Sequence, residues 1–158
     1  MSRVFAVCGM PGSGKGEFAQ VFIDAGIPVR SMGDMVREEV ARRALEVVPE
    51  VFGQVAADLR REFGEEVLAV RLTEAVNTLL DSHPIVLIDG LRGTAEYAVF
   101  KSTWGDDFQS VAIHTDKSIR FTRMMARGRS EDGLRGLIGA QLLHQLATEV
   151  GQLHAPCA

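Results

Sequence analysis

The sequence predicts an α/β fold with a doubly wound parallel sheet of four to five strands, and two observations carry this prediction. Short apolar runs of strand length alternate along the chain with segments whose apolar residues recur at helical spacing. The first strand-like run leads directly into a glycine-rich segment, which a helical pattern then follows. Strands that alternate with helices in this way are typical of a parallel sheet with helices on both faces.

Four segments have the composition of strands. They are expected at Val4–Cys8, Ile27–Val29, Ile85–Ile88 and Ser110–His114. The first and third are continuously apolar, as expected of parallel strands that are covered on both faces. Cys8, at the end of the first strand, is expected to pack as a small buried hydrophobic residue.

Helical patterns fill the intervals between these strands. The first helix is predicted to bury a stripe at i, i+3, i+4 and i+7, formed by Phe18, Val21, Phe22 and Ala25, and to end at Gly26. Asp34 is predicted to cap the second helix, and Pro49 and Gly64 to separate two more. The second of these is predicted to bury Leu68, Leu72, Ala75, Val76 and Leu79. Later helices are expected over residues 95–104, 117–127 and within 134–150.

Composition favours an ordinary globular protein. A chain of 158 residues can bury about 70% of its unfolded surface, so a core can form without metal or disulfide. The net charge of −4 argues against a general binder of nucleic acid or membranes. The chain begins with a strand-like run and has no apolar stretch of about 20 residues, so we expect no signal peptide, no membrane span and a cytoplasmic location.

The glycine-rich segment after the first strand is predicted to bind the phosphates of a nucleoside triphosphate. Its residues are Gly9, Met10, Pro11, Gly12, Ser13, Gly14, Lys15 and Gly16, a Gly-x-x-x-x-Gly-Lys pattern with Gly16 in place of the usual Ser or Thr. Glycines let backbone N–H groups surround phosphate oxygens, and Lys15 adds a full positive charge. The alternative is a glycine-rich turn with an exposed lysine. The motif indicates a P-loop NTPase fold.

The loop also resembles that of adenylate kinases, which have the pattern Gly-x-Pro-Gly-x-Gly-Lys-Gly-Thr. The match extends through Gly16 and ends at Glu17, where the family has Thr. Glu17 is included with the nucleotide-binding residues. Its carboxylate is expected either to point to solvent or to approach a magnesium ion through water.

Two further segments resemble adenylate kinases. Residues 31–37 are similar to Ser-Thr-Gly-Asp-Met-Leu-Arg, which implies that Arg37, with Asp34 in the same segment, binds the phosphate of the acceptor. Met32 replaces the family's Thr, so recognition of the acceptor is expected to differ from that of AMP. Residues 87–92 resemble Leu-Leu-Asp-Gly-Phe-Pro-Arg, which implies that Asp89 organises Mg²⁺ and that Arg92 contacts the acceptor. A simple Asp-Gly turn at the strand end is the alternative.

A row of arginines follows the last predicted strand. Arg120, Arg123 and Arg127 share one helix face, and Arg129 follows Gly128. Kinases of this class have lid arginines that stabilise the transferring phosphoryl group, so the resemblance implies that role for Arg127 and Arg129. A solvated basic stripe is the alternative.

Residues 1 to about 132 together resemble an archaeal P-loop family related to adenylate kinase and dephospho-CoA kinase. The resemblance implies a single kinase-like domain over residues 1–158. Within it we expect a helical acceptor-binding insertion at 35–80, a short lid at 127–133 and an atypical tail at 134–158.

The resulting expectation is a small-molecule kinase that transfers the γ-phosphoryl group of ATP to a nucleoside monophosphate or a similar phosphorylated acceptor. ATP and Mg²⁺ are the expected cofactors, with Lys15, Arg127 and Arg129 as catalytic residues. No nucleic-acid or membrane partner is expected. The alternatives are a slow NTPase or nucleotide-dependent regulatory protein that has no small acceptor, and a nucleotide binder without turnover.

Overall fold

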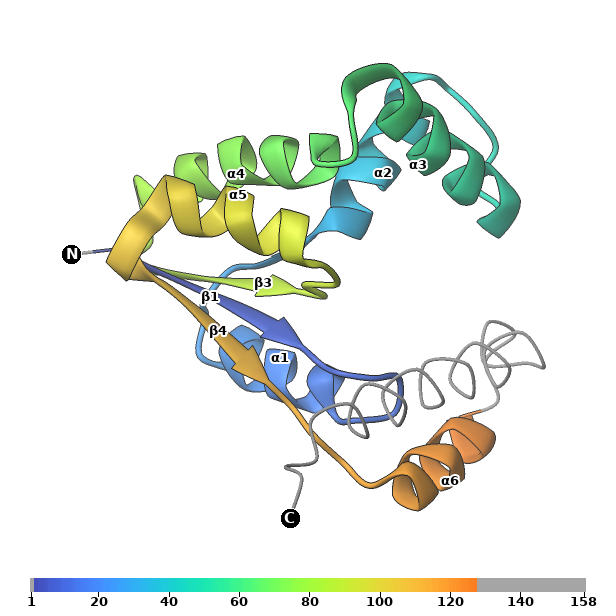
Figure 1. Ribbon diagram of the computed structural model, residues 1–158, viewed down its shortest axis with the longest axis vertical. Coiled ribbons are helices and arrows are strands. Elements are labelled where there is room, and N and C mark those ends of the chain that lie inside the picture. The colour runs from blue at the N-terminus through green and yellow to red at the C-terminus, as the bar shows by residue number, and fades with distance from the viewer. Residues whose placement is uncertain (1, 128–158) are drawn as a thin grey trace, which may run out of the picture. The chain divides into compact units, whose positions relative to one another are not determined.

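A parallel sheet of four strands forms the centre of residues 2–114 (Figure 1). The computed structural model describes residues 2–127. The chain divides into two compact units, residues 1–114 and residues 115–158. The strands of the first unit are β1 (Arg3–Cys8), β2 (Val29–Ser31), β3 (Ile85–Asp89) and β4 (Phe108–Ala112), in the order β2-β3-β1-β4. All neighbouring pairs are parallel, which confirms the predicted sheet.

Two strands begin at positions other than those predicted. β2 starts two residues later than expected because Ile27 still belongs to the end of the preceding helix and Pro28 has no N–H group. β4 starts two residues earlier because Phe108 is buried against the rings of Phe100 and Trp104. Packing of this aromatic group therefore sets where β4 begins.

The helices of the first unit lie on both faces of the sheet (Figure 1). They are α1 (Lys15–Asp24), α2 (Met32–Arg42), α3 (Pro49–Phe63), α4 (Val67–Leu80), α5 (Thr94–Trp104) and the short 3-10 turn η1 (Gly105–Asp107). Helices α4 and α5 cover one face and α1 covers the other. The stripe predicted for α4 is confirmed, since Leu68, Leu72 and Val76 are buried and Ala75 and Leu79 pack against the same core.

The stripe predicted for α1 is partly wrong. Val21 is 65% exposed and Ala25 is also exposed, whereas Ala19 is buried against Val7 and Leu87 of the sheet. The small side chain of Ala19 lets the helix approach the sheet closely, with Phe18 and Phe22 packed beside it. The buried face is therefore turned toward Ala19.

The ends of α1 and α2 are fixed by backbone and side-chain caps. Gly26 has a φ of 72°, and the N–H groups of Gly26 and Ile27 donate to Ile23 and Phe22, as in a Schellman motif. This confirms the predicted helix end. The predicted cap of α2 is wrong by three residues, because Ser31 is the N-cap and Asp34 completes the capping box from the third helical position.

A buried carboxylate joins α2 to α4. Glu39 is 3% exposed and accepts hydrogen bonds from Arg42 and Arg43 on its own chain segment, and from Arg71 of α4 at 3.0 Å. These guanidinium groups, Arg42 first among them, hold the pKa of the Glu39 carboxyl well below its ordinary value. The cluster fixes α2, whose first turn carries Asp34 and Arg37, against α4.

Within the second unit the structure describes α6 (Lys117–Arg127), which has the bounds predicted for it. Arg120 is buried, and its Nε donates to the carbonyl oxygen of Thr115 at 3.0 Å. The predicted lid, apart from Arg127 at the end of α6, and the tail at 134–158 lie outside the described residues. Across residues 2–127, no helix is both long and apolar enough to cross a membrane.

Gly9→Ala is expected to lower the free energy of unfolding by about 2 kcal/mol. Gly9 has a φ of 153°, and a Cβ there would lie 2.6 Å from the carbonyl oxygen of Ile113 and 2.8 Å from Ser13 Oγ. Gly16 is the matched control, since nothing lies within 4 Å of a Cβ at that helical position. Urea denaturation should leave Gly16→Ala as stable as the parent or slightly more stable. Equal losses in both variants would contradict the close approach at Gly9.

Candidate phosphate-binding site

The candidate residues meet at the carboxyl edge of the sheet. Asp89, at the end of β3, is in register with Val7 of β1 and with Ser31 of β2. The glycine-rich loop follows β1 and helix α2 follows β2, so both begin beside Asp89. In parallel α/β sheets, ligands bind at this edge, outside the carboxyl ends of the strands.

The glycine-rich loop has the conformation that only glycines adopt readily. Gly9, Gly12 and Gly14 have φ values of 153°, 77° and 103°. Gly14 is the N-cap of α1, and it has no side chain to accept hydrogen bonds from the N–H groups of the first turn. A helix start of this kind, preceded by a glycine-rich loop, favours the binding of an anionic group.

Lys15 lies over this loop. Its ammonium group donates to the carbonyl oxygen of Gly9 at 2.6 Å and to that of Met10 at 3.1 Å. The positive charge of Lys15 is therefore placed beside the loop backbone. The adjacent Glu17 is exposed.

Asp89 is the most perturbed acidic group at this edge. Burial raises its pKa, while the charges of Lys15 and Arg92 oppose that rise and the charge of Asp34 adds to it. Its Oδ1 atom is buried and has no hydrogen-bond partner among the described residues. Lys15, Arg92 and Asp34 are thus close enough to Asp89 to affect its ionisation.

The surroundings of Asp89 suit a hard cation such as Mg²⁺, with Asp89 as one ligand and oxygen atoms from outside the protein as the others. A desolvated carboxylate oxygen without a hydrogen bond is the kind of donor that Mg²⁺ accepts. Residues 2–127 contain no group of three or more His, Cys, Asp or Glu side chains that could hold a metal ion. Magnesium at Asp89 would therefore depend on phosphate oxygens and water for its other ligands, which is its usual mode of binding in nucleotide sites.

Asp34 positions Arg37. One carboxylate oxygen of Asp34 accepts a hydrogen bond from the backbone N–H of Ser31 at 2.6 Å, and the other accepts one from Arg37 Nη2. A Cβ at Gly33 would lie 3.2 Å from Arg37 Nη1, so glycine leaves room for the guanidinium group. Arg37 is 59% exposed and is therefore accessible to a ligand.

Arg30 is a charged neighbour that the sequence interpretation missed. Its Nε lies 3.8 Å from Asp34 Oδ2, and its Nη2 donates to Glu38 Oε1 at 2.5 Å. The i, i+4 spacing of Arg30 and Asp34 was the available signal, but it spans the boundary between β2 and α2. Periodicity within one element does not reveal such a pair.

The structure thus brings Lys15, Asp34, Asp89 and Arg92 together, with Arg37 linked through Asp34. Arg92 is exposed, and its backbone N–H donates to Glu96 at 2.8 Å. Arg127 is the last residue of α6, in the second unit, and Arg129 lies outside the described residues. The role predicted for these two arginines stays a prediction.

The chain matches a known protein family and several of its members. The model of the AAA domain matches residues 8–137. The chain is 45% identical over 130 residues to the UPF0200/UPF0201 protein of Archaeoglobus fulgidus, a match that covers 82% of this chain and 40% of that protein. It is 42% identical over 130 residues to the UPF0200 protein of Thermococcus onnurineus, covering 82% of this chain and 70% of that protein.

A solved structure supports the fold. TT1252 from Thermus thermophilus superimposes with a TM-score of 0.51 and 19% sequence identity, covering 80% of this chain and 73% of that chain. The matched segment spans less than half the length of the Archaeoglobus relative and about two thirds of the Thermococcus one.

Proposed function

The chain belongs to the AAA domain family and to the UPF0200 proteins, and we propose that it is an ATP-dependent phosphotransferase acting on a small phosphorylated acceptor. The observation that carries the proposal is the group of charges around Asp89, at the end of the strand beside the glycine-rich loop. A nucleoside monophosphate is the first acceptor to test. A reaction that consumes ATP suits a cytoplasmic location.

The loop is proposed to bind the triphosphate of ATP. Backbone N–H groups at the start of α1 face phosphate oxygens, and Lys15 exchanges its contacts with the carbonyl groups of Gly9 and Met10 for contacts with the phosphates. These contacts place the γ-phosphorus and stabilise the negative charge on the group that is transferred.

Asp89 is proposed to hold Mg²⁺ through its buried carboxylate oxygen. The ion, when bound with ATP, supplies charge neutralisation at the phosphates. The ionised form of Asp89 is needed for this role. Lys15 and Arg92 both favour that form, against the effect of burial.

Arg37 is proposed to bind the phosphate of the acceptor, in an orientation that Asp34 fixes, and Arg92 to assist it. With a nucleoside monophosphate, a phosphate oxygen of the acceptor forms the new bond to the γ-phosphorus while the bond to the β–γ bridging oxygen breaks, giving ADP. An ionised acceptor phosphate has no proton to lose, so the reaction needs no general base. Arg127 and Arg129 are proposed to stabilise the moving phosphoryl group from the lid.

Formation of ADP from ATP and Mg²⁺ tests the proposal when it is measured with and without a panel of nucleoside monophosphates and dephospho-CoA. We expect at least one acceptor to accelerate ADP formation well above the rate without acceptor. ADP formation at one rate with every acceptor would favour a slow NTPase instead. No ADP with any acceptor, despite ATP binding, would overturn the proposal.

Asp89→Asn is expected to lower the magnesium-dependent rate of ADP formation about tenfold, because the substitution keeps the shape and removes the charge that holds the ion. The folded state should not lose stability, since the Oδ1 atom of Asp89 has no hydrogen bond to lose among the described residues. Asp107→Asn, at an exposed position of η1, is the control and should leave the rate unchanged. An Asp89→Asn variant with parental magnesium dependence would remove Asp89 from the site.

A further inference from the structure

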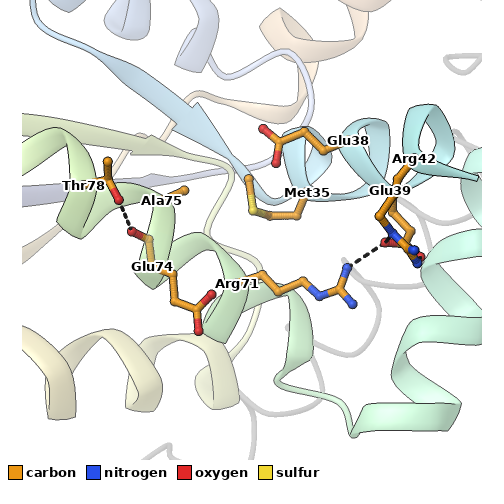
Figure 2. Close-up of a pocket in the computed structure, with 8 residues that line it drawn as sticks. All are labelled: Met35, Glu38, Glu39, Arg42, Arg71, Glu74, Ala75 and Thr78. Atoms are coloured by element: carbon orange, nitrogen blue, oxygen red, sulfur yellow. Dashed lines mark hydrogen bonds and ion pairs between the residues drawn. The ribbon is translucent and has the colours of Figure 1, made fainter.

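A pocket lies between α2 and α4 (Figure 2). Its volume is about 520 Å³, within the range of small-molecule sites. The residues that matter for its chemistry come from both helices and are Met35, Glu38 and Arg42 from α2, and Arg71, Glu74 and Ala75 from α4. The ion pair between Glu39 and Arg71 connects its two walls.

This pocket is on the opposite side of α2 from Arg37. Successive residues of an α-helix are separated by about 100° around the axis, so Arg37 lies about 200° from Met35. Met35 faces the pocket, whereas Arg37 faces Asp34 and Ser31. A ligand in the pocket is therefore distinct from the acceptor proposed above.

One end of the pocket is positively charged. Arg42 donates to Glu39 from its Nε and Nη2, and Arg71 donates to Glu39 from its Nη1. The remaining nitrogen atoms, Arg42 Nη1 and Arg71 Nε and Nη2, have no hydrogen-bond acceptor among the described residues. Glu39 faces three arginines, of which Arg43 is the third. Glu39 raises the pKa of the Arg42 guanidinium, and the charge of Glu62 adds to that rise against the effect of burial. Arg43 and Glu62 do not line the pocket, so at this end the two positive charges of Arg42 and Arg71 face the one negative charge of Glu39.

Away from the arginines, the pocket is lined by apolar side chains and by a carboxylate, which favours an uncharged part of a ligand. Met35 is 4% exposed and lines the pocket together with Ala75, which lies on the side of Glu74 and Thr78 (Figure 2). Glu38 is paired with Arg30, while the Glu74 carboxylate has no ion pair among the described residues. An anionic group is therefore attracted to the arginine end and repelled from the Glu74 end.

We propose that the pocket between α2 and α4 binds a small organic anion. Arg42 and Arg71 hold its carboxylate or phosphate group through charge-assisted hydrogen bonds. Its uncharged part lies on Met35 and Ala75, where a hydroxyl group can donate to Glu74.

Methionine methyl groups give separate signals for the two sites. In the protein labelled with ¹³C at its methionine methyls, Met35 reports on the pocket and Met10 on the glycine-rich loop. Inorganic phosphate and succinate are titrated separately, with sodium chloride at the same ionic strength as the control. We expect a saturable shift of the Met35 signal with at least one of the two anions. Phosphate alone would indicate a phosphorylated ligand, and succinate alone a carboxylated one.

Arg42→Gln should weaken this titration about tenfold, the loss of one charge-assisted contact. Glu39 keeps Arg43 and Arg71 in that variant, so the fold is retained. Arg37→Gln is the matched control and should leave the Met35 titration unchanged. If Arg42→Gln does not fold, Ala75→Leu keeps every charge and should abolish the Met35 response by filling the pocket.

Two results would overturn the proposal. One is a Met35 shift that sodium chloride reproduces at equal ionic strength, or no shift at all. The other is a titration that is as strong in the folded Arg42→Gln or Ala75→Leu variant as in the parent.

Discussion

Lys15→Ala is expected to lower acceptor-dependent ADP formation by about a hundredfold to a thousandfold. The ammonium group of Lys15 is 2.6 Å from the carbonyl oxygen of Gly9, so its charge is available at the loop where the phosphates bind. Removing one positioned donor from a site that stabilises developing charge has effects of this size on turnover. The measurement is the rate of ADP release at saturating acceptor, together with the thermal midpoint of each variant.

Lys101→Ala is the matched control for this result. Lys101 is on α5, where its ammonium group donates to Gly105 at 2.7 Å and pairs with Asp106, and it has no part in the candidate site. The variant removes the same side chain and should keep the parental rate. A Lys15→Ala protein that stays folded and keeps more than about a tenth of the rate would show that the loop does not bind the transferred group.

Glu39→Gln is expected to lower the free energy of unfolding by about 3 kcal/mol at neutral pH, because it removes the charge that three arginines share inside the fold. We place the effect at the low end for a buried pair since the Arg42 side chain is 69% exposed and can be solvated. Glu38→Gln is the control on the same helix. The Glu38 side chain is 59% exposed, so the loss of its pair with Arg30 should cost less than about 1 kcal/mol.

The same variants predict a pH dependence. The pKa of Glu39 is lower in the folded state than its ordinary value of 4.5, so its stabilising effect is complete above pH 4.5 and is lost as the pH falls toward the folded pKa. The difference in stability between the parent and Glu39→Gln should therefore shrink on acidification below that pH. Denaturant unfolding at several pH values measures it. A difference that is constant or grows as the pH falls would contradict the ionised state of buried Glu39.

Local patterns in the sequence were sufficient for most of the architecture. The continuous apolar runs around Val4 and Val86 identified the central strands, because these strands are buried on both faces. The loop was recognisable from its glycines, because backbone with positive φ values favours glycine at Gly9, Gly12 and Gly14. The buried face of α1 was harder to predict. Val21 and Ala19 lie on different sides of the helix, and the packing of Ala19 against Leu87 determines which side is buried.

Features that depend on contacts between distant segments were not predictable. The Glu39–Arg71 pair joins residues 32 positions apart, and no local spacing reveals it. The prediction that Asp34 caps α2 was wrong for a different, local reason. Ser31 and Asp34 both suit the start of a helix, and the geometry of the end of β2 makes Ser31 the cap. The pocket beside Met35 likewise results from the packing of α2 on α4.

We propose above all that the γ-phosphoryl group of ATP passes to an organic phosphate at the loop around Lys15. The most direct test uses ATP labelled with ³²P in the γ-position, Mg²⁺ and the acceptor panel, followed by separation of the products. We predict label in an organic product, dependent on acceptor and lost in Lys15→Ala. Label found only in inorganic phosphate, or retained entirely in ATP, would contradict the account.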